Sequence, residues 1–179
     1  MPAGSLIGDL LLAVFLASCA WLDVKTRQVP NRLTVGALGL ALGAAALAGN
    51  WPSVALVGGL ILISGLAKTT GTGLALGGLA AAAAVSWARP ELGWEAAASQ
   101  LLITTAWLLW RHGLTGGADA KLLITLTLLY GSGVFLAAVL TGGLFGLAAR
   151  LRQKHTLPYI LPVAVGTIGY LALRRILLF

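Results

Sequence analysis

The sequence predicts an all-α, polytopic membrane helix bundle with about eight transmembrane helices, in which residues 1–179 form one transmembrane domain. Composition is the first reason, since 59% of the residues are hydrophobic, a further 24 are Gly and only 9% are charged. A water-soluble domain of this size has too little interior to bury so much apolar surface. Length is the second reason, because a span with its connection needs roughly 20 residues. The 179 residues therefore leave no room for a sizeable domain outside the membrane.

Apolar runs separated by charged or turn residues locate the spans. In chain order they cover Leu6–Leu22, Leu33–Ala48, Trp51–Ala67, Gly71–Trp87, Ala96–Trp110, Ala118–Tyr130, Gly133–Ala149 and Leu157–Leu173. The charged segment Asp23–Asn31 separates the first two, and the turn signals Lys68–Gly73 and Arg89–Glu91 bound the fourth. The sixth and seventh are divided at Gly131–Gly133. One helix over residues 118–150 would be about 50 Å long, well beyond a hydrocarbon core of about 30 Å.

Basic residues predict the orientation, because Lys and Arg accumulate in cytoplasmic loops. With the loop after the first span in the cytoplasm, nine of the 12 basic residues lie on that side: Lys25, Arg27, Arg32, Lys68, Arg111, Lys121, Arg150, Arg152 and Lys154. The pair Arg174 and Arg175 falls outside, against this rule. Both termini are then outside, and an interfacial belt is expected from Trp21, Trp51, Trp87, Trp94, Trp107 and Trp110. Anionic lipid accounts for the net charge of +7, so no nucleic-acid partner is expected.

The predicted topology divides the five carboxylates between the outer and the cytoplasmic face of the membrane. Asp9 lies near the outer end of the first span, and Glu91 and Glu95 fall in a predicted outer loop. Asp23 ends the first span and Asp119 begins the sixth. Four spans separate these two residues, an even number, so both reach the cytoplasmic face. Two carboxylates at span ends of one face are the minimum for an aspartyl dyad.

Paired carboxylates are suited to hydrolysis. Two carboxylates a few ångströms apart cannot both ionise, so one retains a proton while the other acts as general base on a shared water. The water attacks a carbonyl and the protonated partner donates to its oxygen. A structural alternative stays open from position alone, because Asp119 opens a span, where an acidic side chain favourably faces a helix N-terminus.

The neighbours of the two aspartates carry a family resemblance. The first segment reads Asp-Val-Lys-Thr-Arg-Gln-Val-Pro-Asn over residues 23–31, and the second reads Gly-Gly-Ala-Asp-Ala-Lys-Leu over residues 116–122. Together they resemble the two signature motifs of the type IV prepilin peptidase family, GxGD-type membrane aspartic peptidases with an archaeal preflagellin peptidase branch. The first family motif is an Asp followed by basic residues and then Ile/Val-Pro-Asn. The second motif is Gly, any residue, a Gly or an apolar residue, and Asp, and it is closely followed by Lys-Leu.

The resemblance implies a role for each matching residue. It makes Asp23 and Asp119 the catalytic pair. The supporting motif residues are Gly116 and Gly117, which let backbone pass close to Asp119, Ala118 in a slot where many relatives have Gly, and Pro30 and Asn31, which turn the chain into the second span. Three basic residues, Lys25, Arg27 and Lys121, would contact either lipid or substrate, and anchoring on lipid is favoured.

The resemblance also implies the substrate and the place of action. The substrate would be a pilin-like or archaeal flagellin-like precursor, cut between a short basic leader and a hydrophobic helix, as in type IV pilus assembly and protein secretion. The enzyme would lie in the cytoplasmic (inner) membrane with its active site facing the cytoplasm. It would use no cofactor and no metal, and His112 and His155 lack a third ligand for a metal site.

Two departures from the family pattern are visible. The aspartates are 96 residues apart with four predicted spans between them, where the family core usually has about two, so we expect an insertion within Gly71–Trp110. Larger bacterial members carry an N-terminal domain with paired Cys-x-x-Cys motifs. This sequence has one cysteine, Cys19, and begins at the first span, so a peptidase-only form is expected.

Two other functions remain as alternatives. A small proton- or cation-coupled transporter would use Asp23 and Asp119 as a relay, although such relays usually lie near the bilayer midplane. A GxGD intramembrane protease of the presenilin type would place both aspartates inside spans. The basic residues Lys25 and Arg27 directly after Asp23 favour the membrane surface instead.

Overall fold

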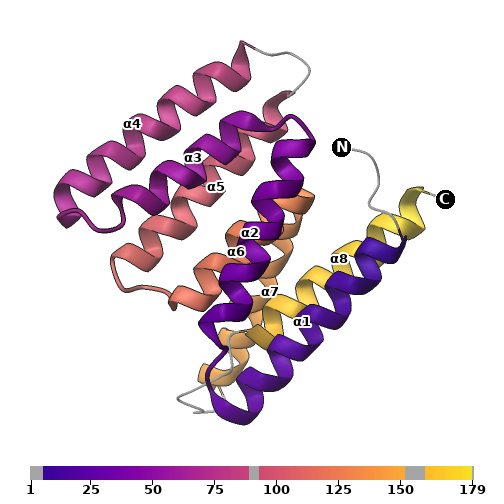
Figure 1. Cartoon of the computed structure of the whole chain (residues 1–179). Helices are drawn as coiled ribbons and strands as arrows, with labels where there is room; N and C mark the ends of the chain where they lie inside the picture. The colour runs from indigo at the N-terminus through magenta and orange to yellow at the C-terminus, as the bar shows by residue number, and fades with distance from the viewer. Residues whose placement is uncertain (1–5, 89–92, 152–159, 179) are drawn as a thin grey trace. The chain divides into compact units, whose positions relative to one another are not determined.

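The computed structural model describes residues 6–88, 93–151 and 160–178, and these ranges form eight α-helices and no strand (Figure 1). The helices are α1 Leu6–Thr26, α2 Asn31–Leu47, α3 Trp51–Ile63, α4 Lys68–Trp87, α5 Gly93–Arg111, α6 Gly117–Tyr130, α7 Ser132–Leu151 and α8 Ile160–Leu178. Helices α1, α4 and α8 are long and apolar enough to cross a membrane, and α2, α3 and most of α7 are shorter apolar helices. The predicted all-α membrane helix bundle is confirmed.

Helix boundaries depart from the predicted spans at a few places. Helix α1 continues to Thr26, so Asp23 lies inside the last turn of the helix rather than after it. The split between the sixth and seventh spans is present, because α6 ends at Tyr130 and Gly131 takes a left-handed φ of +84°. The predicted start of the last span at Leu157 lies outside the described residues, and α8 begins at Ile160.

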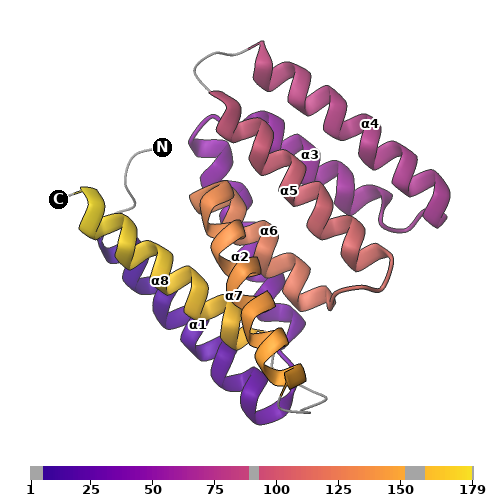
Figure 2. The same ribbon diagram turned by 180° about the vertical axis from the view of Figure 1, so that it is seen from behind.

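The helices form two compact units. Unit 1 comprises Met1–Pro30 and Gly133–Phe179, and unit 2 comprises Asn31–Ser132. In unit 1, α1 lies alongside α8 in opposite direction, as both views show (Figures 1 and 2). A Cβ at Gly166 of α8 would lie 2.7 Å from the carbonyl oxygen of Ala137 in α7, so these two helices are in close contact at this glycine.

An ion pair joins α1 to α8 in unit 1. The guanidinium of Arg175 donates to Asp9 Oδ2 from Nε at 2.9 Å and from Nη2 at 2.6 Å. The side chains are 31% and 14% exposed, respectively. A positive charge at this end of α8 therefore has a carboxylate partner, which gives a physical reason for the departure of Arg175 from the positive-inside pattern.

Unit 2 contains a buried helix and a three-helix layer. In helix α6, Ala120 and all residues from Leu122 to Leu128 are buried, and the helix packs on α2 and α5. Helices α3, α4 and α5 pack on one another. Gln100 of α5 is fully buried and its Nε2 donates to Ser86 Oγ of α4 at 2.7 Å and to Ser53 Oγ of α3 at 3.4 Å. Hydrogen bonds between helices of this kind help to hold spans together where lipid replaces water.

The α5 residues Trp107 and Arg111 are structural in unit 2. Arg111 donates from Nη1 to the carbonyl of Ser64 at 2.7 Å and from Nη2 to the carbonyl of Leu66, which satisfies free carbonyls after the end of α3. Trp107 is 3% exposed, lies under the guanidinium and donates to Ser64 Oγ at 3.1 Å. The expectation that Trp107 belongs to an interfacial belt is therefore wrong, because its indole fills the helix interface.

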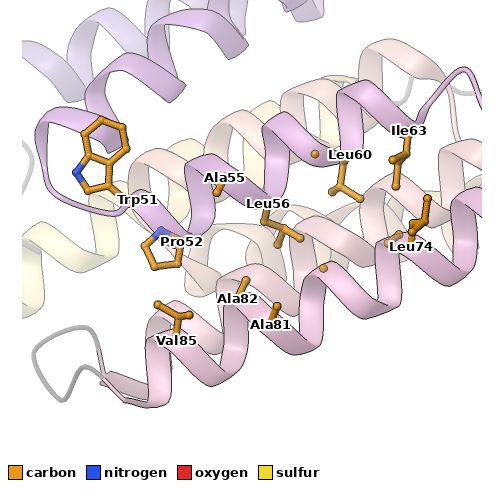
Figure 3. A pocket seen from close by; sticks show the side chains of 13 residues that line it. Trp51, Pro52, Ala55, Leu56, Leu60, Ile63, Leu74, Ala81, Ala82 and Val85 are labelled. Carbon is orange, nitrogen blue, oxygen red and sulfur yellow. The ribbon is translucent and has the colours of Figure 1, made fainter.

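An apolar groove of about 570 Å³ runs between α3 and α4 (Figure 3). Leu56 and Leu60 of α3 lie on one side, Leu74 and Ala82 of α4 on the other, and the remaining lining residues include Gly59 and several alanines. None of the lining residues is ionisable. The groove therefore offers no acid–base chemistry and is not the candidate active site.

Candidate active site

The two candidate catalytic carboxylates lie in different units. Asp23 belongs to the last turn of α1 in unit 1, and Asp119 belongs to the first turn of α6 in unit 2. That the two carboxylates pair stays a prediction.

Asp23 is buried and hydrogen-bonded. The residue is only 9% exposed, and its Oδ2 accepts a hydrogen bond from the backbone N–H of Ile160 at 2.9 Å. Ile160 is the first residue of α8, where backbone N–H groups have no acceptor within their own helix. The carboxylate therefore provides an acceptor for the N–H at the start of α8, and this N–H provides a donor for the buried carboxylate.

The backbone turns sharply after Asp23. Arg27 has a φ of +56°, in the left-handed region that favours glycine, and its N–H donates to the carbonyl of Asp23 at 2.9 Å. This is the common way for a helix to end, although a side chain there costs about 1 kcal/mol relative to glycine. Thr26 Oγ1 adds a bond to the carbonyl of Leu22 at 2.7 Å. The last turn of α1 is thus held by several contacts around Asp23.

Asp119 lies over a glycine at the start of α6. Gly116 is the residue before the helix, and a Cβ there would lie 2.7 Å from Asp119 Oδ2 and 3.4 Å from its Cγ. A Cβ at Gly117 would instead lie 3.1 Å from Nε1 of Trp110. The two glycines therefore make room for different side chains, and only Gly116 borders the carboxylate. Asp119 and Ala118 are half-buried in the first turn of α6, where the helix end favours negative charge.

A hydrogen bond joins a residue of each motif within unit 2. Lys121 of α6 donates from Nζ to Oδ1 of Asn31, the first residue of α2, at 2.6 Å. The N-terminal ends of α2 and α6 are therefore adjacent. Pro30 directly precedes α2, as expected for a residue that turns the chain into the second span. For Lys121 the bond to Asn31 gives a structural role that the sequence alone did not indicate.

The other basic motif residues face outward. Lys25 and Arg27 are both exposed at the end of α1. Among the described residues, no group of three or more His, Cys, Asp or Glu side chains is arranged to bind a metal. His155, one of the two histidines considered for a metal site, lies outside the described residues.

Sequence reasoning missed one partner of the aspartates and one neighbour of a motif glycine. Ile160 is 137 residues from Asp23 and contributes a backbone N–H, which has no signature in the side-chain pattern. Trp110 was assigned to the membrane interface, yet its indole lies against Gly117. Neither contact follows from a local motif, because both depend on tertiary packing.

Comparison with known proteins gives a family. No curated protein and no solved structure matched the chain. The model of the type IV leader peptidase family matches residues 10–151. This range includes both motifs, with Asp23 and Asp119, and covers well over half of the chain. The chain therefore belongs to the type IV leader peptidase family, and it is a membrane protein of the peptidase class.

Proposed function

We propose that this protein is an aspartic endopeptidase that removes the short basic leader of pilin-like, or archaeal flagellin-like, precursors at the cytoplasmic face of the cytoplasmic membrane. The observation that carries the proposal is the family match over residues 10–151, which includes two motifs that each contain one aspartate. Outside these motifs the described acidic residues have structural partners, since Asp9 pairs with Arg175 and Glu95 Oε1 accepts from the N–H of Ser132 at 2.6 Å. Asp23 also has a partner, the N–H of Ile160, so the choice of Asp23 and Asp119 for catalysis rests on the two motifs.

In the proposed mechanism the two aspartates act as a pair. One carboxylate takes a proton from a water molecule, and the water oxygen attacks the carbonyl carbon at the leader junction. The other, protonated carboxyl donates its proton to the carbonyl oxygen, giving a tetrahedral gem-diol. This intermediate then collapses, the C–N bond breaks, and the leaving amine takes a proton from the dyad. No cofactor is needed for this sequence of proton transfers.

The cytoplasmic face is supported by charge. Exposed Lys25 and Arg27 follow Asp23, and Lys121 follows Asp119, so both aspartates are flanked by residues of the kind that accumulate on the cytoplasmic side. A basic leader that stays in the cytoplasm while its apolar helix crosses the bilayer presents its junction at this interface. Because like charges repel, we assign Lys25 and Arg27 to lipid headgroups rather than to the basic leader.

The covalent chain supports the pairing of the aspartates. Asp23 precedes Asn31 by eight residues, and Asn31 is hydrogen-bonded to Lys121, two residues after Asp119. The first motif therefore ends at a residue that contacts the second motif. The two motifs are therefore linked by a contact within the protein that does not involve the substrate.

The test uses purified wild type, Asp23→Asn and Asp119→Asn in detergent, each with a precursor that contains its leader and membrane helix. We expect cleavage at the leader junction by the wild type, and a loss of at least about 10³-fold in either variant with thermal unfolding unchanged within a few degrees. Wild-type activity in a folded variant would remove that residue from the dyad. No cleavage by the wild type, combined with proton or cation flux in vesicles that either substitution abolishes, would favour a transporter.

A further inference from the structure

We infer that the backbone N–H of Ile160, at the start of α8, positions the carboxylate of Asp23 for catalysis. The inference rests on the proposed function and deepens it. It extends the site beyond residues 10–151, which are the residues that match the family model. In this view α8 is part of the catalytic apparatus rather than only a neighbour of α1.

The contact is buried on both sides. Ile160 is 2% exposed and Asp23 is 9% exposed, and the bond between Ile160 N and Asp23 Oδ2 is 2.9 Å long. Both residues belong to unit 1. A buried carboxylate without a partner is costly, and so is a buried N–H at the first position of a helix. Each group thus removes the cost of burying the other, which fixes where the carboxylate lies.

The bond leaves one carboxylate oxygen for chemistry. Among the described residues, Asp23 Oδ1 accepts no hydrogen bond, whereas Oδ2 is held by Ile160. A hydrogen bond from an N–H to a carboxylate is stronger and shorter than a neutral one, and it restricts the side-chain rotamer. Asp23 is therefore preorganised, with Oδ1 as the oxygen that can exchange a proton with water.

Packing of α8 does not depend on this bond alone. At the opposite end of α1, Asp9 forms its ion pair with Arg175 of α8. The two helices also pack on each other, and next to the ion pair Leu10 and Ala13 of α1 and Leu171 of α8 line a shared apolar pocket. Loss of the Ile160 bond should therefore leave α8 alongside α1, and the positioning effect can be measured in a folded protein.

The decisive variant is Ile160→Pro, compared with Ile160→Ala. Proline removes the N–H that reaches Asp23, and it is well tolerated at the first position of a helix, where that N–H has no intrahelical acceptor. Alanine keeps the N–H while removing more of the buried side chain than proline does. The pair therefore separates the hydrogen bond from the packing of the side chain.

We expect Ile160→Pro to lower kcat for precursor cleavage about tenfold or more relative to Ile160→Ala, with KM unchanged. Thermal unfolding of both variants in detergent reports whether they are folded. Equal kcat values in the two folded variants would overturn the inference, because the side chain alone would then account for the effect of position 160.

A second measurement does not depend on activity. Amide hydrogen exchange at Ile160 is followed by NMR in protein labelled with ¹⁵N-isoleucine, and the signal is assigned by its disappearance in Ile160→Val. We expect exchange to become about tenfold faster in Asp23→Ala, because the acceptor is lost. Unchanged exchange would overturn the inference. A folded wild type that cleaves no precursor would count against the proposed function, while the exchange experiment would still decide whether Asp23 binds Ile160.

Discussion

At Gly116 the absence of a side chain leaves room for the carboxylate of Asp119. The φ of −68° and ψ of 149° at Gly116 are values that any residue adopts, so alanine carries no backbone penalty there. A Cβ would nevertheless lie 2.7 Å from Asp119 Oδ2, which is closer than a Cβ carbon approaches an oxygen to which it is not bonded. The glycine is thus required by the position of the carboxylate and not by the turn.

Replacement of Gly116 should therefore impair catalysis more than folding. We expect Gly116→Ala to lower kcat about tenfold or more, because displacement of a catalytic group by about 1 Å costs up to about 100-fold. Cleavage kinetics and thermal unfolding are measured together. The matched control is Gly117→Ala, whose Cβ would meet Trp110 instead of Asp119. The same loss of kcat in both variants would contradict this account of Gly116.

The bond between Lys121 and Asn31 makes a second prediction at the residue scale. It joins the first residue of α2 to the first turns of α6 at 2.6 Å. In a double-mutant cycle of Asn31→Ala and Lys121→Ala, we expect a coupling free energy of about 1 kcal/mol. This coupling free energy is measured by comparing the wild type, the two single variants and the double variant, either by reversible unfolding in detergent or by how well each stays folded during heating. Strictly additive effects would assign Lys121 to lipid or substrate, as the sequence suggested.

At the scale of the elements, the pairing of α1 with α8 is tested through Asp9 and Arg175. We expect Arg175→Gln to lower the free energy of unfolding by about 1–3 kcal/mol, because it removes the cation that pairs with the half-buried carboxylate of Asp9. The matched control is Arg174→Gln, which also removes one positive charge but from the preceding residue. The exchange Asp9→Arg with Arg175→Asp should restore part of the loss. Equal destabilisation by Arg174→Gln and Arg175→Gln would contradict a specific ion pair.

The helices themselves were largely predictable, whereas several of their ends were not. Apolar runs and turn residues located all eight helices, and the split at Gly131 followed from the thickness of a bilayer. Helix ends depend on the local backbone conformation and on distant partners. Helix α1 extends past Asp23 because the left-handed Arg27 ends it later, and Arg111 satisfies carbonyls 45 and 47 residues away. No local pattern encodes such contacts.

For the whole molecule, the proposed orientation can be tested by labelling. In a Cys19→Ala background, we expect a cysteine introduced by His112→Cys to react with an impermeant maleimide only from the cytoplasmic side. A cysteine introduced by Ala48→Cys should react only from outside. Both positions are exposed, one between α5 and α6 and the other after α2. Labelling of both from one side would contradict the proposed topology, which rests on the basic residues.

Prediction of the site from sequence was uneven for a physical reason. The motif residues Asp23, Asp119 and Gly116 were identified from short patterns along the chain. The contacts of Ile160 with Asp23 and of Trp110 with Gly117 were not, because a backbone N–H and an indole edge become relevant only after the helices have packed. Asn31 and Lys121 were identified singly, but their contact joins residues 90 positions apart. Short patterns therefore identified the proposed catalytic carboxylates but not the tertiary contacts around the two motifs.

Unit 2 is one continuous stretch of chain, whereas unit 1 is assembled from segments on both sides of it. During synthesis all of unit 2, which contains Asp119, has been made once Ser132 is added, but the hydrogen-bond partner of Asp23 is made only with Ile160. At about 5–20 residues per second, this delay lasts on the order of seconds. Under the proposed mechanism the nascent chain thus reaches its full activity only after α8 is inserted, so maturation of the enzyme is coupled to the synthesis of this helix.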